Sequence, residues 1–456
     1  MKKPSQKQIL TGKCFDLSFE GKGVFKDGNT IFFVDGMFPN EEGEIEILYK
    51  RNGALFGKVK KLTKVSPNRI QPKCKVCSSC GGCCFQQLEY KAQLEYKTNK
   101  VKEQFKKIAK MNVDVNPCIG MDDPYFYRNK IQMPFGKDNK GNPYCGFYKA
   151  STHVIVPIDI CYIEDKRSEH ILSSIKSLLK SFKIEPYNED EKWGILRHVL
   201  IKTSFYKKEI MVVLVTAIDS FPSRNNFVKA LLKLCPEITT VVQNINSRST
   251  NVILGEKEHV LYGKGYIEDS LCGVNFQISS KSFYQTNPVM TEKLYSYAIG
   301  KANLNKNEVA FDAYSGIGTI GLIASKSAKE IISVELVPQA VKDGIKNAKR
   351  NNINNFKMYC DDASSFMVKM AKNKQTVDAL FMDPPRKGSD ERFLKAVLML
   401  KPKKIVYVSC DPTTLARDIA YISKSYKIED IQPFDMFPQT FHVETVVLLS
   451  RKNGEK

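Results

Sequence analysis

One cysteine near the C-terminal end of the chain, Cys410, stands where an apolar run stops, in the sequence KKIVYVSCDPTTLARD. The pattern predicts a buried strand whose last residues reach the carboxyl edge of a sheet, where ligands bind in open α/β folds. A free thiol has a pKa of about 8.5, so only a small fraction is thiolate at neutral pH. A nearby cation such as Arg386 would increase that fraction. A buried, inert cysteine is the competing interpretation.

A carboxylate occupies a comparable position in FDMFPQTFHVETVVLLSR, where Glu444 directly precedes an apolar run. If its strand lies beside the one that ends at Cys410, Glu444 is placed to act as a general base. A thiolate that adds to carbon 6 of uracil makes carbon 5 nucleophilic, and a base must then remove the carbon-5 proton. One Cys, one Glu and one methyl donor satisfy this chemistry. A surface carboxylate is the alternative.

The segment FDAYSGIGTIGLIAS indicates where a methyl donor would bind. It places Asp312 in an apolar strand, then a turn with Gly316 and Gly318, then a helix. Glycines there let a ligand approach the backbone, and Glu335, at the end of the next apolar run, suits a ribose diol. The spacing D-x-x-x-G-x-G differs from the dinucleotide-binding G-x-G-x-x-G. It favours S-adenosylmethionine over NAD.

Asp383-Pro384-Pro385 closes a third apolar run, and its two prolines predict a rigid loop at the same edge of the sheet. Amino-methyltransferases place an aromatic residue after such a Pro-Pro pair to stack on a flipped base. Here that residue is Arg386. The difference argues against methylation of an exocyclic nitrogen.

The elements that must position these residues follow from periodicity. From about residue 290 strand and helix patterns alternate, which predicts a doubly wound parallel sheet. Residues 10–62 alternate short β-branched or aromatic runs with turn signals at Asp27-Gly28-Asn29 and Arg51-Asn52-Gly53, and predict a five-stranded barrel. Residues 125–280 read as mixed α/β without a chemical motif. Phenylalanines of the barrel either stack on RNA bases or form its core: Phe25, Phe32, Phe33 and Phe38.

The bulk composition limits the class of protein. A chain of 456 residues predicts two to four domains, and a net charge of +21 with a pI near 9.2 predicts a polyanionic partner such as nucleic acid. A lysine-rich proteome is the alternative. The N-terminus is polar and no apolar run approaches the roughly 20 residues of a membrane helix, so we expect a cytoplasmic protein without a membrane partner. The stretch QLEYKAQLEYKTNKVKEQFKKIAKM predicts a basic amphipathic helix whose lysines face either phosphates or water.

Cysteines gather in CKVCSSCGGCC, where residues 74–84 hold five of the 13 in the chain. In a reducing compartment disulfides are a poor explanation for them. The spacing C-x2-C-x2-C-x3-C, through Cys74, Cys77, Cys80 and Cys84, mimics a ferredoxin without the usual following proline. Four thiolates also suit zinc.

Three spaced motifs, DPPRKG, IVYVSCDPTT and FDMFPQTFHVE, closely resemble the RNA uracil-5-methyltransferase family. The N-terminal module resembles a TRAM domain, an OB-like barrel. The resemblance implies a C-terminal Rossmann-like class I methyltransferase sheet, a central α+β domain carrying an iron–sulfur cluster, and the small β-barrel. The corresponding division is 1–63 for the barrel, 64–288 for the central domain with its RNA-binding surface, and 289–456 for the methyltransferase domain.

Carried over residue by residue, the resemblance implies that Cys410 is the nucleophile and Glu444 the base. It implies contacts with S-adenosylmethionine from five residues: Gln285, Tyr314, Glu335, Asp362 and Asp383. The match of Asp362 to the family position is ambiguous, because Asp361 lies next to it. Asp411 departs from the family, where many relatives carry Asn. This leaves the nucleophile intact and puts local hydrogen bonding to the base in doubt.

The resemblance also implies a second ligand set for the cysteines, C-x5-C-G-G-C with a distant fourth ligand in VPIDICYIED. A [4Fe–4S] cluster is then held by Cys74, Cys80, Cys83 and Cys161. The chain is expected to make 5-methyluridine in a flipped base of a 23S ribosomal RNA loop, with no obligate protein partner. The alternatives are the same chemistry on the T-loop of transfer RNA, a non-catalytic RNA-binding or assembly factor, and an iron–sulfur redox protein.

Overall fold

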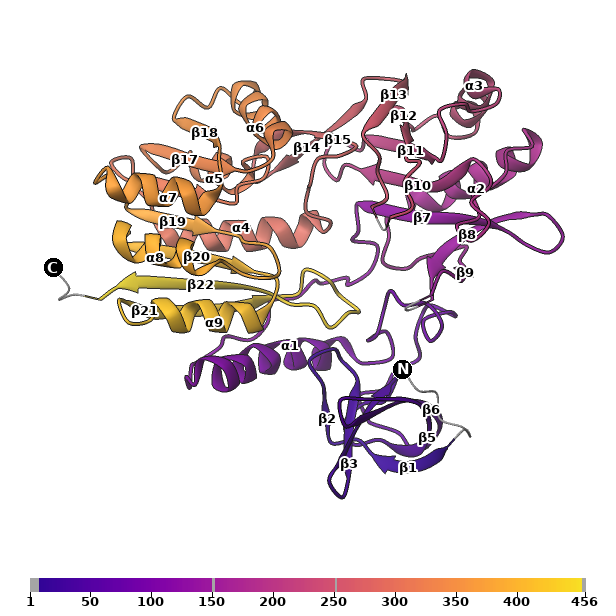
Figure 1. Ribbon diagram of the computed structural model, residues 1–456, viewed down its shortest axis with the longest axis horizontal. Helices are drawn as coiled ribbons and strands as arrows, with labels where there is room; N and C mark the ends of the chain where they lie inside the picture. Colours follow the sequence, from indigo (N-terminus) through magenta and orange to yellow (C-terminus); the bar gives the residue numbers. More distant parts are fainter. Residues whose placement is uncertain (1–7, 150–151, 251, 453–456) are drawn as a thin grey trace.

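The computed structural model describes residues 8–149, 152–250 and 252–452, which form three regions around separate sheets (Figure 1). The prediction of an α/β fold is confirmed. In these ranges, no helix combines the length and the apolar character that a membrane span requires. The predicted divisions after residues 63 and 288 stay predictions.

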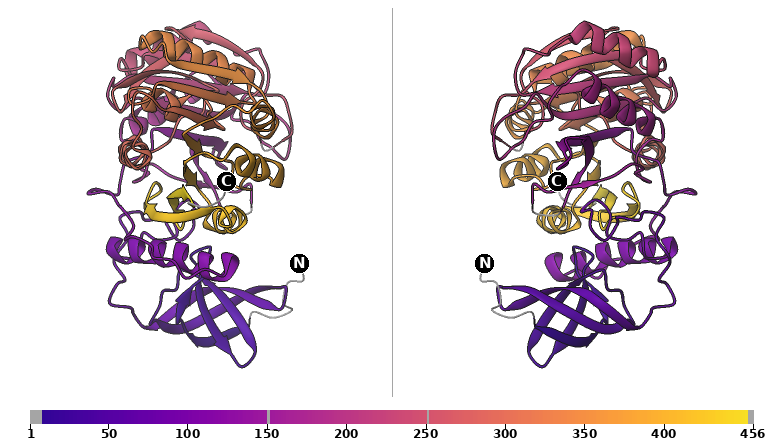
Figure 2. Two further views of the ribbon diagram at one scale, coloured as in Figure 1. Left: turned by 90° about the vertical axis from the view of Figure 1, so that its left-hand side faces the viewer. Right: turned by 90° about the vertical axis from the view of Figure 1, so that its right-hand side faces the viewer.

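The N-terminal sheet curls beneath the rest of the molecule (Figure 2). It has six strands in the order β1-β5-β6-β4-β3-β2, one more than predicted, because one strand is only two residues long. Both predicted hairpin turns are confirmed, between β3 and β4 and between β5 and β6. Phe25 and Phe32 belong to the core, and Phe33 is half-buried against Phe56. The strands are β1 Ile9–Lys13, β2 Asp16–Leu17, β3 Gly23–Asp27, β4 Thr30–Asp35, β5 Glu42–Arg51 and β6 Ala54–Lys64.

A connecting segment of turns, residues 65–89, carries the cysteines and leads into the predicted basic helix. That helix is α1, Tyr90–Gln104, extended by the π-helix η1, Phe105–Ala109. The sequence predicts that the lysines of this helix face phosphates or water. Two of them do neither, because they are buried. Lys97 is fully buried in an ion pair with Asp435, and Lys100 is buried and donates to the backbone oxygen of Phe441 at 2.8 Å. Part of the basic charge of α1 therefore serves the fold.

The central region is a seven-stranded sheet in the order β13-β12-β11-β10-β7-β8-β9, with α2 (Arg167–Ser181) and α3 (Arg224–Leu234) packed on one face. The other face shares a hydrophobic core with the hairpin β14–β15 and with the C-terminal sheet. The mixed α/β character predicted for residues 125–280 is confirmed. The strands of this region are β7 Lys130–Lys137, β8 Pro143–Tyr148, β9 Ile155–Pro157, β10 Leu196–Thr203, β11 Ile210–Thr216, β12 Thr240–Ile245, β13 Lys257–Tyr262, β14 Tyr266–Leu271 and β15 Val274–Ser279.

The C-terminal sheet has the order β18-β17-β16-β19-β20-β22-β21 and is covered by helices on both faces. The prediction of a wholly parallel sheet is wrong for one strand, β22, while β21 beside it runs in the common direction. β22 runs antiparallel to both β20 and β21, because a short hairpin connection joins β21 to β22. The strands are β16 Val309–Ala313, β17 Glu330–Glu335, β18 Phe356–Cys360, β19 Ala379–Met382, β20 Lys404–Ser409, β21 Tyr426–Phe434 and β22 Glu444–Arg451.

The helices of this region divide between the two faces. Side chains of α4, α5 and α6 share one core with the central region, and side chains of α7, α8, α9 and α1 share the other. They span α4 Pro288–Ala302, α5 Thr319–Ala324, α6 Pro338–Arg350, α7 Ala363–Lys372, α8 Glu391–Leu400 and α9 Pro412–Ile422. The carboxyl ends of the parallel strands thus meet the central region and the end of α1.

Candidate active site

Strand pairing brings Cys410 and Glu444 together. β20 ends at Ser409 and β22 begins at Glu444, and the antiparallel register places Ser409 opposite Thr445. The next pair outward is therefore Cys410 and Glu444, at the edge of the sheet. The expected adjacency of the two strands is confirmed, while the roles of the two residues stay predictions.

The thiol of Cys410 is harder to ionise than an ordinary cysteine. Its pKa is raised to about 12, mainly by burial and also by the charges of Glu444 and Asp383, while the charge of Arg386 lowers it. Arg386 therefore acts in the expected direction, but burial and the two carboxylates outweigh it. Formation of the thiolate requires added positive charge or a proton acceptor close to Cys410.

Three buried carboxyl groups surround this edge. The pKa of Glu444 is raised well above its ordinary value by burial and by the charge of Asp383. Burial raises the pKa of Asp383 to about 7, and it raises that of Asp312 to about 7 against hydrogen bonds from Gly321 and Ser333. Each group is costly to ionise in the protein alone, so the site favours a cationic ligand.

A crevice for such a ligand is expected where the strand order reverses, between β16 and β19. The turn after β16 has positive φ at Gly316 and Gly318, 57° and 79°, a region that glycine adopts without strain. A Cβ added at Gly316 would meet no atom within 4 Å, so the space above this turn is open. Glu335 ends β17 beside it and accepts hydrogen bonds at 2.9 Å from the amides of Gly316 and Val337.

The remaining predicted cofactor residues lie around this crevice or next to it. Tyr314 follows β16 with a left-handed backbone, and its hydroxyl lies 3.4 Å from the Ser389 hydroxyl. Asp362 caps α7 by accepting from the Ser365 amide, whereas Asp361 pairs with Lys369. Asp361 is therefore engaged at the surface, and the role of Asp362 stays a prediction.

Gln285 lies beside a tyrosine, Tyr295, that no sequence pattern distinguishes. The side-chain amide of Gln285 lies 3.4 Å from the hydroxyl of Tyr295, which is buried on α4. Burial raises the pKa of Tyr295, and the charges of Asp383 and Glu444 raise it further. The tyrosine therefore lies among the acidic groups of the site. Nothing in the helical pattern of α4 distinguishes Tyr295 from an ordinary core residue.

A group of cations faces the other side of the catalytic edge and was also not predicted from the sequence. The pKa of His442 is lowered to about 4, mainly by burial and also by four nearby cations: Arg386, Lys100, Lys97 and Arg128. His442 is therefore neutral at physiological pH. Its ring lies 4.2 Å from that of Phe441, centroid to centroid. Of these cations, Arg386 also acts on Glu444, whose pKa its charge lowers.

Asp411, the departure from the family pattern, has a structural role. Its side chain accepts hydrogen bonds from the amides of Thr413 and Thr414 at 2.8 and 3.3 Å and so caps α9. Asp and Asn are about equally good N-cap residues. The exchange therefore leaves the geometry that follows Cys410 intact.

The cysteines of residues 74–84 separate into two groups. The Cys83 thiol feels the charges of Cys80 and Cys74, and the Cys161 thiol, far away in sequence, feels that of Cys83. Cys84 instead feels mainly Lys97 and Lys100. These interactions connect the four thiols that the resemblance implies as ligands, Cys74, Cys80, Cys83 and Cys161, but the charge of Cys84 acts on Cys83 as well, so the ligand set stays a prediction. Cys77 lies near Cys74 and Cys80 and remains a competing ligand.

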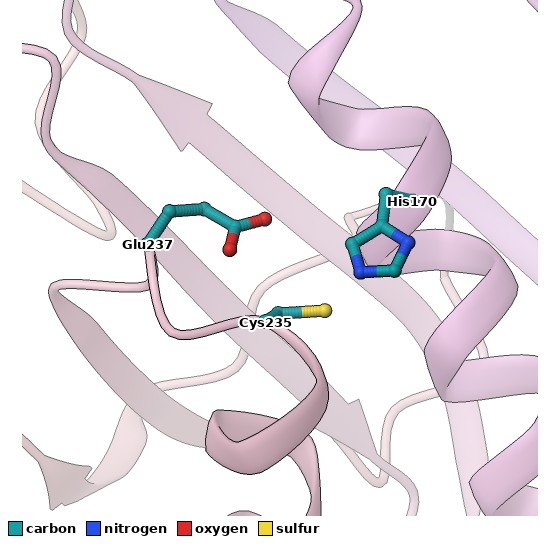
Figure 3. A group of neighbouring side chains, drawn as sticks. All are labelled: His170, Cys235 and Glu237. Atoms are coloured by element: carbon teal, nitrogen blue, oxygen red, sulfur yellow. The ribbon is translucent and has the colours of Figure 1, made fainter.

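Another group of ligand-type side chains lies in the central region, on α2 and after α3 (Figure 3). Ligand atoms of His170, Cys235 and Glu237 lie within 4.8 Å of one another. The His170 Nε2 atom lies 2.9 Å from the backbone oxygen of Leu234, and the Cys235 thiol hydrogen-bonds to Ser174. Since two of the three groups already have protein partners, we assign no metal to them.

Known proteins similar to this chain agree with one another. Residues 89–452 match the family model described as tRNA (Uracil-5-)-methyltransferase. An uncharacterized RNA methyltransferase of Staphylococcus aureus is 40% identical over 449 residues, which cover 98% of this chain and 99% of that protein. An uncharacterized RNA methyltransferase of Clostridium acetobutylicum is 41% identical over 440 residues, 96% and 95% of the two chains.

A solved structure is similar over nearly the whole chain. It is the crystal structure of Pyrococcus abyssi tRNA (uracil-54, C5)-methyltransferase in complex with S-adenosyl-L-homocysteine. The TM-score is 0.77 at 27% identity, and the match covers 96% of this chain and 100% of that one. The N-terminal sheet and the cysteine-bearing segment are therefore largely within the matched length.

Proposed function

The chain belongs to the tRNA (uracil-5-)-methyltransferase family, and from this premise we propose that it methylates carbon 5 of a uridine in RNA through a covalent adduct with Cys410. The observation that carries the proposal is the pairing of β20 with β22. It sets a nucleophile and a carboxylate side by side at the edge where the methyl donor is expected. The product is 5-methyluridine.

In this mechanism the Cys410 sulfur forms a bond to carbon 6 of the uracil, and the electron pair of the ring becomes an enolate centred on carbon 5. S-adenosylmethionine supplies the methyl group as a sulfonium electrophile. S-adenosyl-L-homocysteine is left after the methyl transfer, Glu444 then takes the proton from carbon 5, and the bond from Cys410 to carbon 6 breaks so that the sulfur leaves as the thiolate that began the reaction. The raised pKa of Glu444 makes its ionised form a strong proton acceptor.

The buried carboxyl groups fit a cationic donor. Asp383 and Asp312 each have a pKa of about 7, and a sulfonium nearby would stabilise their ionised forms. We propose that the donor lies over the Gly316 turn. The residues that hold it would be Gln285, Tyr314, Glu335, Asp362 and Asp383. The S-adenosyl-L-homocysteine complex of the Pyrococcus abyssi enzyme supports a donor of this class.

For the substrate we propose a loop of 23S ribosomal RNA, from which the target base is flipped at a cost of about a few kcal/mol. The net charge of +21 and a TRAM-like function of the N-terminal sheet favour a large RNA. The T-loop of transfer RNA is the second candidate, and the Pyrococcus abyssi enzyme, which acts on tRNA uracil-54, favours it. Methylation of 23S and transfer RNA transcripts by the purified protein, with mapping of 5-methyluridine, separates the two.

For the gathered cysteines we propose a [4Fe–4S] cluster held by Cys74, Cys80, Cys83 and Cys161. A tetrahedral zinc site with bonds of about 2.3 Å would hold its sulfurs within roughly 3.8 Å of one another. Among the described residues no three cysteine sulfurs lie within 4.8 Å of one another. The thiols in these residues are therefore not already closed around a single ion. The methyl transfer needs no electron, so the cluster would hold structure.

The proposal is tested with RNA that contains 5-fluorouridine. A base cannot remove fluorine as a cation, so the adduct with Cys410 should persist as a denaturation-resistant protein–RNA complex when the methyl donor is present. Cys410→Ala should form none. Tritium release from 5-tritiated uridine RNA gives an independent readout, since a non-catalytic RNA-binding factor releases none. Absence of both signals with intact protein on ribosomal and transfer RNA would refute the proposed function.

A further inference from the structure

The connection between β21 and β22, residues 435–443, is held by many partners outside its own hairpin. Lys97 of α1 pairs with Asp435, and Lys100 donates to Phe441. The Asn287 side chain donates to the Met436 oxygen at 3.1 Å, and the Tyr127 hydroxyl donates to the Pro438 oxygen at 3.0 Å. A loop of this length has many conformations open to it, so these contacts select one.

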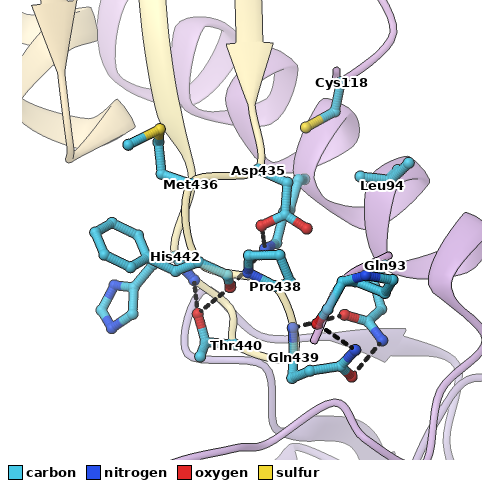
Figure 4. Close-up of polar contacts among 12 residues, drawn as sticks. Gln93, Leu94, Cys118, Asp435, Met436, Pro438, Gln439, Thr440 and His442 are labelled. Atoms are coloured by element: carbon cyan, nitrogen blue, oxygen red, sulfur yellow. Dashed lines mark hydrogen bonds and ion pairs between the residues drawn. The ribbon is translucent and has the colours of Figure 1, made fainter. Parts of the chain in front are cut away.

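At the tip of this loop Gln439 forms a reciprocal pair with Gln93 of α1 (Figure 4). The Gln439 amide donates to the Gln93 side-chain oxygen at 3.1 Å, and the Gln93 side-chain nitrogen donates to the Gln439 side-chain oxygen at 3.1 Å. Each residue is 1% exposed. Buried amides are satisfied here by each other, although 346 residues separate them in the chain.

The same residue also receives the end of the cysteine segment. The amides of Cys84 and Phe85 donate to the backbone oxygen of Gln439 at 3.1 and 3.0 Å. Cys83, the preceding residue, is one of the four predicted ligands. Two backbone hydrogen bonds therefore connect the cysteine segment directly to the 435–443 loop.

The backbone of Gln439 is strained. Its φ is 70°, in the left-handed region that residues other than glycine and asparagine rarely adopt. Such conformations persist only where the surroundings hold them, and they gather at functional sites. The Gln93 pair and the Cys84 and Phe85 amides are the groups that hold this one.

We propose that Gln439 is a positioning residue of the catalytic edge, which fixes the loop that leads through His442 into Glu444. The ladder between β21 and β22 places the Glu444 backbone opposite Phe434. The loop also carries His442, two residues before Glu444, to a place near Arg386, whose charge acts on both residues. This inference rests on the proposed function of Glu444 as the base.

The test uses the full chain with unmodified RNA and follows the two halves of the reaction separately. Gln439→Gly keeps the left-handed backbone without strain and removes only the side-chain bonds. Misplacement of a reacting group by about 1 Å costs roughly 10²-fold, so loss of the adduct should slow by that order while its formation changes little. The covalent complex should therefore accumulate with ordinary uridine RNA. Gln439→Asn, which tolerates positive φ, should recover part of the rate.

A double-mutant cycle and a control variant make the result decisive. Gln93→Ala should slow adduct loss at least as much, since the Gln93 side chain also accepts from the Gln439 amide and donates to the Phe85 and Leu88 oxygens. The double variant should be no slower than Gln93→Ala alone, because that change already removes the bond between the two side chains. Gln432→Ala removes another buried glutamine, which lies on β21 and donates to the backbone oxygen of Pro117. This variant should leave adduct loss unchanged. Adduct loss at the intact rate in Gln439→Gly overturns the inference, as does an equal effect in Gln432→Ala. Failure of the intact protein to form any adduct refutes the proposed function instead.

Discussion

Two regions of this molecule use the same chemical group in opposite ways. At the catalytic edge a single thiol, Cys410, lies between carboxylates at the end of a buried strand. In the segment of residues 74–84 several thiols lie on turns that belong to no strand or helix. The first thiol has its neighbours determined by strand register. The second group has its neighbours determined by where a loop is attached.

The difference teaches which contacts each site depends on. Cys410 and Glu444 meet because β20 and β22 pair along six residues, so the sheet itself holds the two backbones together. The cysteine segment is held by single hydrogen bonds, among them the Cys74 amide to Gln86 at 3.1 Å and the Cys84 amide to Gln439. We therefore expect the catalytic pair to be robust in position, and the cysteine segment to depend on what it binds.

The largest expected effect follows from removing the thiol of the catalytic edge. Cys410→Ala should lower turnover by about 10⁴-fold or more, because no other group can form the bond to carbon 6. Cys360→Ala, which removes an exposed cysteine at the end of β18, should leave turnover unchanged. Methyl incorporation from labelled S-adenosylmethionine measures both. Residual turnover of Cys410→Ala near the intact rate would contradict the proposed nucleophile.

Removal of a thiol from the other region should act on iron content first. Cys161→Ser should lower iron and the thermal midpoint together, since a cluster that binds only the folded chain stabilises it. Cys84→Ser is the matched control, because Cys84 lies near Lys97 and Lys100 and not within the group of four. Iron analysis and a melting curve of anaerobically purified protein give the answer. Unchanged iron in Cys161→Ser would leave the ferredoxin-like set, through Cys77 and Cys84, as the better assignment.

The link between the two regions is tested through α1. Lys97→Met leaves Asp435 buried and unpaired, which should cost about 3–5 kcal/mol in the free energy of unfolding. Lys102→Met, on the exposed side of the same helix, should stay within about 0.5 kcal/mol. Urea unfolding of the two variants measures the difference. Equal stabilities would show that the 435–443 loop does not depend on its ion pair with α1.

The catalytic region was largely predictable because its signals are periodic and local. An apolar run that ends at Cys410 and another that begins at Glu444 predict strand ends, and alternating strands and helices predict the sheet. The antiparallel return of β22 was not predicted, because a hairpin and a crossover look alike when the connecting residues lack a two-residue turn signal. The net effect of burial on the Cys410 thiol was also missed, since burial is a property of the fold.

The cysteine region and α1 were less predictable for the same reason. Spacing alone left two ligand sets open, and only the chain path shows Cys161 near Cys83 and Cys84 turned toward lysines. Lysines in a helical pattern predict a solvated face, yet Lys97 is buried because Asp435, from the far end of the chain, pairs with it. The Gln93–Gln439 pair has no sequence signal at all. Long-range polar partners are what the linear pattern does not contain.

The smallest expected effect is a pH dependence at the catalytic edge. Burial raises the pKa of Asp383 from the ordinary value near 3.8 to about 7, so its carboxyl is mainly protonated below that pH. A sulfonium binds the ionised form. The affinity for S-adenosylmethionine should therefore fall by about tenfold between pH 8 and pH 6, with release of a proton on binding at the lower pH. Calorimetry in two buffers of different ionisation enthalpy measures the proton.

Stability should change with the opposite sign in the absence of the donor. A carboxyl whose pKa is higher in the folded state than in the unfolded chain contributes stability below pH 3.8, and this contribution is lost as the pH rises toward about 7. Added S-adenosylmethionine should therefore raise the thermal midpoint more at pH 8 than at pH 6. Asp383→Asn should weaken binding at pH 8 and flatten its pH dependence. Asp361→Asn, which removes the carboxylate paired with Lys369, should change neither. A pH-independent affinity in the intact protein would mean that the donor does not lie beside Asp383, and the acidic crevice would need another ligand.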